Sequence, residues 1–136
     1  MSFDDLKIND NVLRGVYGHG FEKPSQIQID AIPIMLEGKD IVAQAQSGTG
    51  KTGAFSIGSL CRIEPSNNTI QCLIIVPTRE LADQVYKVIT DISSYTNITT
   101  LKVKNVPNFY LFHKNELKGN CSGADINKVK DLLSKI

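Results

Sequence analysis

The chain has 136 residues and a formal net charge of +1, and 41% of its residues are hydrophobic and 21% charged. This size and composition are those of a single folded domain with a core, and they exclude a disordered chain. No apolar run approaches membrane-spanning length, and Met1 to Asp5 lack the basic start and apolar core of a secretory signal. We therefore expect a cytoplasmic protein that makes no contact with membranes.

The first predicted elements are two helices. Residues 5–18 have an apolar side and end at the sequence Gly18-His19-Gly20, as helices often do. Ser25 is a suitable N-cap for a second helix, which Pro33 kinks or interrupts and Gly38 closes.

A short apolar strand, residues 41–43, then leads into a glycine-containing loop and a helix from Lys51 to about Ile63. Small residues let successive backbone N–H groups turn toward an anion, and the N-terminus of a helix favours negative charge. Lys51 offers a mobile charge to the β and γ phosphates of a nucleotide, and Thr52 offers a hydroxyl to Mg²⁺. The predicted phosphate-binding residues are Ala45, Gln46, Ser47, Gly48, Thr49, Gly50, Lys51 and Thr52.

The first position of this loop departs from the general phosphate-loop pattern, because Ala45 stands where glycine is usual. Alanine is tolerated there if the backbone does not need a positive φ. The alternative is a Gly/Ser/Thr-rich turn that ends in Lys-Thr by coincidence. The strand before the loop and the helix after it favour the nucleotide site.

The next apolar run, Cys72 to Val76, is typical of a strand buried on both faces of a parallel sheet, and Pro77 ends it. A helix from about Arg79 to Ser94 follows. Alternating strands and helices predict an α/β fold of three layers around a mainly parallel sheet.

The composition changes near residue 100, since residues 1–101 carry 8 basic and 11 acidic side chains and residues 102–136 carry 7 and 3. An antiparallel hairpin is predicted from the segments Val106 to Phe112 and Leu117 to Cys121 and the polar turn between them. Asp125 is a natural N-cap for a final amphipathic helix.

Three motifs in residues 1 to about 100 resemble the start of a DEAD-box RNA helicase, closest to the translation-initiation-factor branch. The family's adenine-reading motif resembles Phe3-Asp4-Asp5-Leu6 together with Gly20 to Gln28. Its phosphate loop resembles Ala45 to Thr52, and its first RNA-contacting motif resembles Pro77 to Leu81. The resemblance implies part of a RecA-like domain of the P-loop NTPase class, with ATP and Mg²⁺ as ligands.

The adenine-reading residues would be Gln28 and Phe3. An amide can pair with N6 and N7 of adenine, and an aromatic ring can stack on the base. The resemblance adds Lys23 to the nucleotide-binding residues. Taken alone, Gln28 is more simply a solvated helix residue.

The RNA-contacting residues would be Pro77, Thr78, Arg79 and Glu80. A helix start with a hydroxyl and an arginine at the carboxyl end of a strand suits a phosphate, and the resemblance implies a single-stranded RNA backbone. Without the resemblance, Thr78 is an N-cap and the next two residues form a solvated first turn.

The 136 residues contain no Asp-Glu-Ala-Asp strand, no Ser-Ala-Thr motif and no second RecA-like domain. In the family, the carboxylates of the acidic strand organise Mg²⁺ and the attacking water. No catalytic residue is therefore assigned, and we expect little or no ATPase or unwinding activity.

Residues 101–136 resemble the C-terminal third of a thioredoxin-like domain, with Val106-Pro107 before an aromatic strand and Ser122-Gly123-Ala124 before a helix. The redox C-x-x-C motif is absent, so the resemblance implies no oxidoreductase chemistry. A generic hairpin and helix covering a sheet edge is the alternative. We interpret the chain as two parts, 1–100 and 101–136, in one globular unit, with the hairpin entering the same sheet as residues 41–43 and 73–76.

The function favoured by the sequence is therefore an ATP-binding part of a helicase with weak RNA contact. One alternative is a chimeric or remnant interaction domain with a vestigial nucleotide site. A weaker one is thiol exchange through Cys121. Self-association through an open sheet edge is expected if the edge stays uncovered.

Overall fold

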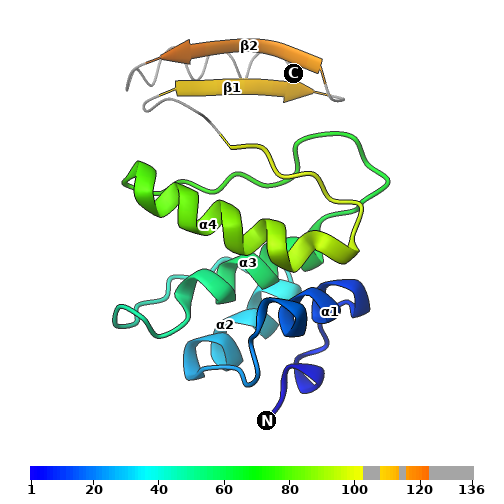
Figure 1. The fold of residues 1–136 in the computed structure, drawn as a ribbon, viewed down its shortest axis with the longest axis vertical. Helices are drawn as coiled ribbons and strands as arrows, with labels where there is room; N and C mark the ends of the chain where they lie inside the picture. The colour runs from blue at the N-terminus through cyan, green and yellow to red at the C-terminus, as the bar shows by residue number, and fades with distance from the viewer. Residues whose placement is uncertain (103–107, 114–115, 123–136) are drawn as a thin grey trace.

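The computed structural model describes residues 1–102, 108–113 and 116–122 (Figure 1). Up to Tyr95 the chain forms helices, and two strands follow. In chain order the elements are η1 (Phe3–Leu6), α1 (Asp10–His19), α2 (Gln26–Leu36), α3 (Lys51–Arg62), α4 (Arg79–Ile92), η2 (Ser93–Tyr95), β1 (Asn108–His113) and β2 (Glu116–Ser122).

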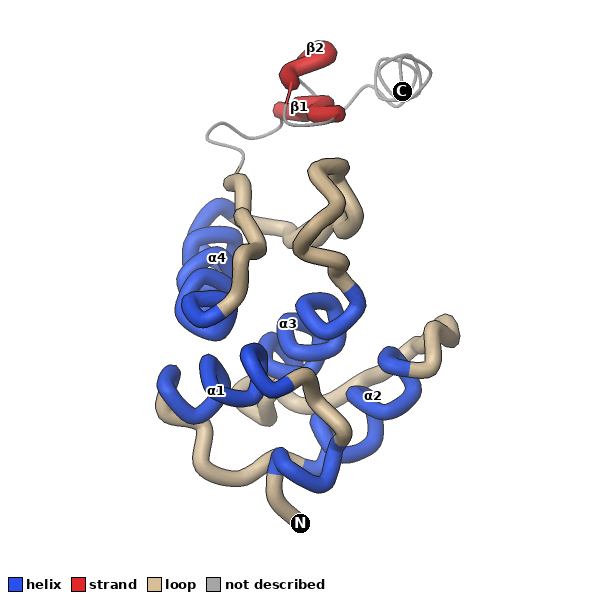
Figure 2. The backbone as a smooth tube through the Cα atoms, turned by 90° about the vertical axis from the view of Figure 1, so that its right-hand side faces the viewer, coloured by secondary structure: helices blue, strands red, loops and turns tan. Residues whose placement is uncertain are grey.

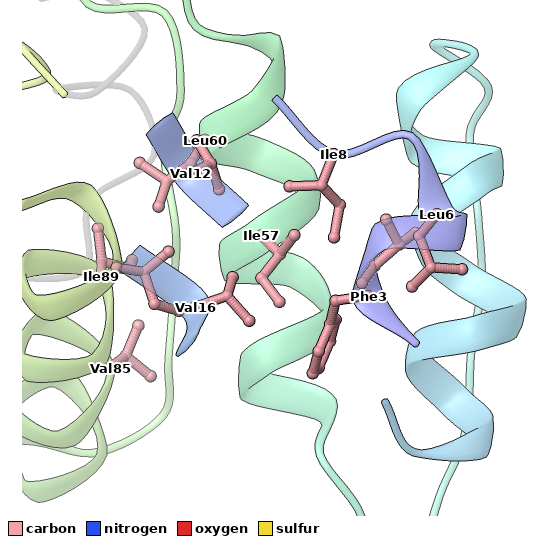
Figure 3. Close-up of a cluster of buried hydrophobic side chains, with 11 residues drawn as sticks. Phe3, Leu6, Ile8, Val12, Val16, Ile57, Leu60, Val85 and Ile89 are labelled. Carbon is pink, nitrogen blue, oxygen red and sulfur yellow. The ribbon is translucent and has the colours of Figure 1, made fainter. Parts of the chain in front are cut away.

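Helix α3 is the centre of the core. Figure 3 shows it between α4 on one side and η1 with α2 on the other, with Ile57 pointing into the middle of the cluster. Burying side chains of this size stabilises the fold by about 1.5–3 kcal/mol each. The buried cluster consists of Phe3, Leu6, Ile8, Val12, Val16, Ile32, Ile57, Leu60, Val85, Ile89 and Ile92.

The helix expected over residues 5–18 is two elements, η1 and α1. Lys7 adopts a left-handed conformation with φ 58°, which ends the first turn. Asn9 then begins α1, and its side-chain oxygen accepts a hydrogen bond from the backbone N–H of Asn11 at 2.9 Å. The break places Phe3 and Leu6 in the core while α1 turns toward α4.

The other helices begin where the sequence predicts. Ser25 is the N-cap of α2, and Pro33 lies inside that helix without ending it. Helix α3 begins at Lys51, and Thr78 caps α4 by accepting a hydrogen bond from the backbone N–H of Leu81 at 3.2 Å.

The parallel sheet expected around residues 41–43 and 72–76 is not formed within the described residues. Both segments lie outside regular secondary structure, and the one sheet of the described residues consists of β1 and β2. A segment becomes a strand only when a neighbour satisfies its backbone groups, and neither segment has such a neighbour in the part of the chain that the structure describes.

The predicted hairpin is confirmed, because β1 pairs antiparallel with β2 from Asn108↔Ser122 to His113↔Glu116, with an irregularity after Leu111. Among the described residues, the strands of the hairpin pair only with each other, so the hairpin does not enter a sheet with residues 41–43 and 73–76. Figure 2 shows it beyond α4, at the end of the molecule opposite the N-terminus. The helix predicted from Asp125 and the Val106-Pro107 pair lie outside the described residues.

None of the helices in the described part of the chain is both long enough and apolar enough to cross a membrane.

Candidate nucleotide-binding site

The predicted phosphate loop lies at the N-terminus of α3. Gly48 and Gly50 have φ values of 78° and 98°, in the left-handed region that glycine adopts without strain. Gly50 is the N-cap of α3, so the free N–H groups of the first helical turn point out beside the loop. The tip is open, since a Cβ built on Gly48 would have no heavy atom within 4 Å.

Two side chains at this loop form hydrogen bonds with the loop's own backbone carbonyl groups. The ammonium of Lys51 donates to the carbonyl oxygen of Ala45 at 2.5 Å, and the hydroxyl of Thr49 donates to the carbonyl oxygen of Gln46 at 2.5 Å. A phosphate oxygen is a stronger acceptor for Lys51 than a carbonyl, because the hydrogen bond is then charged on both sides. The residues present therefore fit an anionic ligand at this helix terminus.

A magnesium ion at this site would depend on Thr52 and on the phosphates. Thr52 is half-buried in the first turn of α3, directly after Lys51. In the described ranges, no three His, Cys, Asp or Glu side chains gather closely enough to hold a metal ion. The chain therefore offers one hydroxyl ligand here, next to the place expected for the nucleotide's own oxygens.

Gln28 is buried, with 3% of its surface exposed. Its Oε1 accepts a hydrogen bond from the backbone N–H of Ser25 at 2.9 Å, and its Nε2 donates to the carbonyl oxygen of Gly50 at 3.1 Å. The amide that was expected to read adenine is thus engaged with the protein itself, between the start of α2 and the start of α3.

Sequence reasoning missed this link, although a signal for it was present. Ser25-Gln26-Ile27-Gln28 is a capping-box pattern, in which the residue three places after the cap returns a hydrogen bond to the cap's backbone N–H. The pattern predicts the contact with Ser25. It does not predict the contact with Gly50, which the packing of α2 against α3 creates.

Phe3 lies in the core instead of at the nucleotide site. Its ring is fully buried and meets Tyr17 edge-on, with the ring centroids 6.1 Å apart, and Phe21 at 6.3 Å. In this conformation no ring face is open to a base, so the stacking expected from the sequence is not available. Phe21 packs against the core, as expected, and Lys23 is exposed.

The predicted RNA-contacting residues surround the N-terminus of α4. All four residues, Pro77, Thr78, Arg79 and Glu80, are exposed, and Thr78 uses its hydroxyl as the helix cap. Neither charged side chain forms a salt bridge within the described residues. In Figure 1, α3 and α4 begin on the same side of the molecule, so the two predicted sites share one side.

Comparison with known families gives one match, to the DEAD/DEAH box helicases, over residues 25–121. This match runs past residue 100, where the sequence interpretation placed the end of the helicase-like part.

The curated relatives of this chain include two proteins named eukaryotic initiation factor 4A. A probable eukaryotic initiation factor 4A of Trypanosoma brucei brucei is 58% identical over 94 residues, which are 69% of this chain and 23% of that protein. Eukaryotic initiation factor 4A of Caenorhabditis elegans is 51% identical over 100 residues, which are 74% of this chain and 25% of that protein. The chain therefore spans about a quarter of the length of these relatives.

Solved structures of similar proteins are also available for comparison with the fold of this chain. Dbp5 of Saccharomyces cerevisiae, bound to RNA and ADP BeF3, superposes with a TM-score of 0.70 and 42% identity over 72% of this chain and 26% of that one. A DEAD box protein of Methanococcus jannaschii superposes with a TM-score of 0.64 and 42% identity, and the match covers 68% of this chain and 25% of that one.

Proposed function

Because the chain belongs to the DEAD/DEAH box helicase family, we propose that its first hundred residues are part of the first RecA-like domain of an initiation-factor-type RNA helicase and bind ATP with Mg²⁺. The observation that carries the proposal is the placement of Lys51 and Gly50 at the exposed N-terminus of α3. That terminus combines free N–H groups, a helix dipole and a mobile ammonium, which together favour a polyphosphate.

On ATP binding, Lys51 exchanges its neutral acceptor, the Ala45 carbonyl, for the oxygens of the β and γ phosphates. The N–H groups of the loop would donate to the same phosphate oxygens, and the hydroxyl of Thr52 would be a ligand for a magnesium ion bound with the nucleotide. A bound ATP·Mg²⁺ would supply the phosphoryl group, and its magnesium ion would supply the positive charge that neutralises the phosphates. The residues of this chain hold and orient the nucleotide.

Base recognition is assigned to Gln28. Its amide has a second acceptor lone pair and a second N–H beyond the two that Ser25 and Gly50 use. Because Gln28 is 3% exposed, adenine reaches it only if the α2–α3 contact loosens. Phe3 joins the base only if its ring leaves the core, which costs about 3–5 kcal/mol for a buried phenylalanine.

RNA contact is assigned to the start of α4. Arg79 is exposed and free of salt bridges within the described residues, and the helix terminus beside it favours an anion. These contacts position a phosphate backbone and carry no base specificity.

Turnover is not assigned to these 136 residues, because they contain no Asp-Glu-Ala-Asp segment to position water and magnesium. The proposal is therefore binding of ATP, with weak RNA contact and little hydrolysis by this stretch of chain.

The test is titration of the 136-residue chain with a fluorescent ATP analogue in the presence of Mg²⁺. Lys51→Ala should weaken binding at least about tenfold, or 1.4 kcal/mol. Lys39→Ala is the matched control, because Lys39 is an exposed lysine that pairs with Glu37, and it should leave the affinity unchanged. Absence of binding by the parent chain, or equal losses in both variants, contradicts the proposal.

A second candidate function is an interaction domain whose nucleotide site is vestigial. The burial of Phe3 and Gln28 favours it, since both base-reading side chains are engaged within the protein. A specific ligand raises the melting temperature by stabilising the native state. An unchanged melting temperature with ATP·Mg²⁺ would therefore support this candidate, and an increase that Lys51→Ala removes would support the first.

A further inference from the structure

The side-chain amide of Gln28 lies in a notch between two glycines at the start of α3. Gly50 and Gly53 are three residues apart, so they lie on the same face of the first helical turn. A Cβ built on Gly50 would lie 2.7 Å from Gln28 Nε2, and a Cβ built on Gly53 would lie 2.5 Å from the same atom. The amide therefore occupies space that only glycine leaves open at both positions.

Two hydrogen bonds hold the amide in this glycine notch. Its Nε2 donates to the carbonyl oxygen of Gly50 at 3.1 Å, and its Oε1 accepts from the backbone N–H of Ser25 at 2.9 Å. Gln28 is 3% exposed, and Gly53 is buried. The notch is thus a resting place in which the amide is bonded without any ligand.

The ring of Phe21 is the other neighbour of Gly53. A Cβ on Gly53 would lie 3.3 Å from two carbons of this ring. The ring is itself packed against His19, with the ring centroids 4.7 Å apart, and against Phe3 at 6.3 Å. Because the ring is held by neighbours of its own, a methyl group at position 53 displaces the Gln28 amide, which is the end of a flexible side chain.

The notch competes with adenine for the amide of Gln28. A ligand loses apparent affinity in proportion to the fraction of molecules that are not ready to bind it. We propose that Gly53 sets the base selectivity of the nucleotide site, because it leaves room for the Gln28 amide to stay bonded to Gly50. This role rests on the proposed function, and it makes Gly53 a positioning residue that acts through Gln28.

The two purine bases respond differently when the amide is released. Adenine presents a donor at N6 and an acceptor at N7, which match the two groups of the amide, whereas guanine presents acceptors at both O6 and N7. Gly53→Ala places a methyl group in the notch and moves the amide away from the Gly50 carbonyl. The released amide therefore favours an adenine nucleotide over a guanine nucleotide.

The test is titration of the 136-residue chain with fluorescent analogues of ATP and of GTP in the presence of Mg²⁺. Gly53→Ala should raise the ratio of ATP affinity to GTP affinity at least about fivefold over the parent. In a Gln28→Ala background the same substitution should leave the ratio unchanged, because no amide is there to be released. An unchanged or lower ratio in Gly53→Ala overturns the proposal, and so does an equal rise in the Gln28→Ala background.

Gly58→Ala is the matched control. Gly58 is a buried glycine of the same helix, and its added Cβ would also meet a flexible side chain, at 2.6 Å from Met35 Sδ. All three of its nearest heavy atoms belong to Met35, so the Gln28 amide is not disturbed. This variant should keep the ratio within about twofold of the parent. Equal changes in Gly53→Ala and Gly58→Ala contradict a specific role for Gly53.

A second variant releases the amide without filling the notch. Ser25→Pro removes the N–H that bonds to Gln28 Oε1, at a φ of −74° that proline adopts. It should raise the ratio in the same direction as Gly53→Ala. Far-UV circular dichroism shows whether each variant keeps its helices. If Gly53→Ala loses its helices, an unchanged ratio in Ser25→Pro overturns the proposal.

Failure of this inference differs from failure of the proposed function. If the parent binds the ATP analogue through Lys51 and the ratio does not respond to Gly53→Ala, ATP binding stands and the role of Gly53 is rejected. If the parent binds neither analogue, the proposed function is rejected and the role of Gly53 with it.

Discussion

The side-chain amide of Gln28 donates a hydrogen bond to the carbonyl oxygen of Gly50 at 3.1 Å, and so ties the start of α2 to the proposed phosphate loop. The same side chain accepts from the backbone N–H of Ser25 at 2.9 Å. A hydrogen bond between buried groups leaves an unsatisfied partner when either side is removed. The conformation of the loop therefore depends on a residue more than twenty positions earlier in the chain.

Replacing Gln28 should test this link directly. Gln28→Ala leaves the Ser25 N–H and the Gly50 carbonyl without their partner, and should lower the free energy of unfolding by about 1–3 kcal/mol. Urea unfolding measures the change. Gln26→Ala, which removes an exposed contact with Asp30, should stay within about 0.5 kcal/mol of the parent. Equal losses would show that the buried link contributes nothing.

The two glycines of the loop should differ in their tolerance of alanine. Both have positive φ, which costs alanine about 1–2 kcal/mol. At Gly50 the new Cβ would also lie 2.6 Å from the Ser25 hydroxyl oxygen and 2.7 Å from Gln28 Nε2, whereas at Gly48 it meets nothing. Gly50→Ala should therefore lower the melting temperature clearly more than Gly48→Ala. A larger loss at Gly48 would contradict the packing described here.

The contact between α1 and α4 depends on Gly15. A Cβ at this position would lie 1.8 Å from the carbonyl oxygen of Ile92, so Gly15→Ala must push the helices apart. We expect a loss of about 3 kcal/mol or more in urea unfolding. Gly18→Ala in the same helix is the control, since its nearest neighbour is Tyr95 at 3.5 Å and alanine favours helix by up to about 1 kcal/mol. A fully folded Gly15→Ala chain with parental stability would refute this account.

Cys61 and Cys72 should react at different rates with a thiol reagent. Burial raises the pKa of the Cys61 thiol, so at a given pH a smaller fraction is the reactive thiolate, while Cys72 is exposed. In a Cys121→Ser background, the reaction should show a fast phase that Cys72→Ser removes. The slow phase, from Cys61, should accelerate as pH rises toward its raised pKa. A fast phase that survives Cys72→Ser would contradict the assignment.

Local sequence signals predicted the helices well, because their causes are local. Thr78 and Ser25 lie at helix starts as predicted, and α3 begins at Lys51 after the glycines. The break at Lys7 was missed, since a left-handed lysine has no periodic signature. The hairpin was predicted from the segment Val106 to Phe112, the polar turn after it and the segment Leu117 to Cys121, and β1 and β2 confirm it within the described residues.

Long-range relationships were not predictable in the same way. The pattern of Cys72 to Val76 reports that these residues can form a strand, but pairing depends on a neighbour that the pattern does not contain. Phe3 shows the same limit, since its ring fills the core instead of standing open to a base. Whether a side chain is free for a ligand depends on everything packed around it.

The sequence by itself determined the glycine-containing loop proposed to bind phosphate, the helix that follows it and the family resemblance, because these depend on residue types at fixed local spacing. Only the tertiary structure decided that Gln28 is bonded to Gly50 and that Phe3 is buried. The physical reason is that burial and hydrogen-bond partners are set by contacts between distant segments, where each side chain's environment is supplied by other parts of the chain.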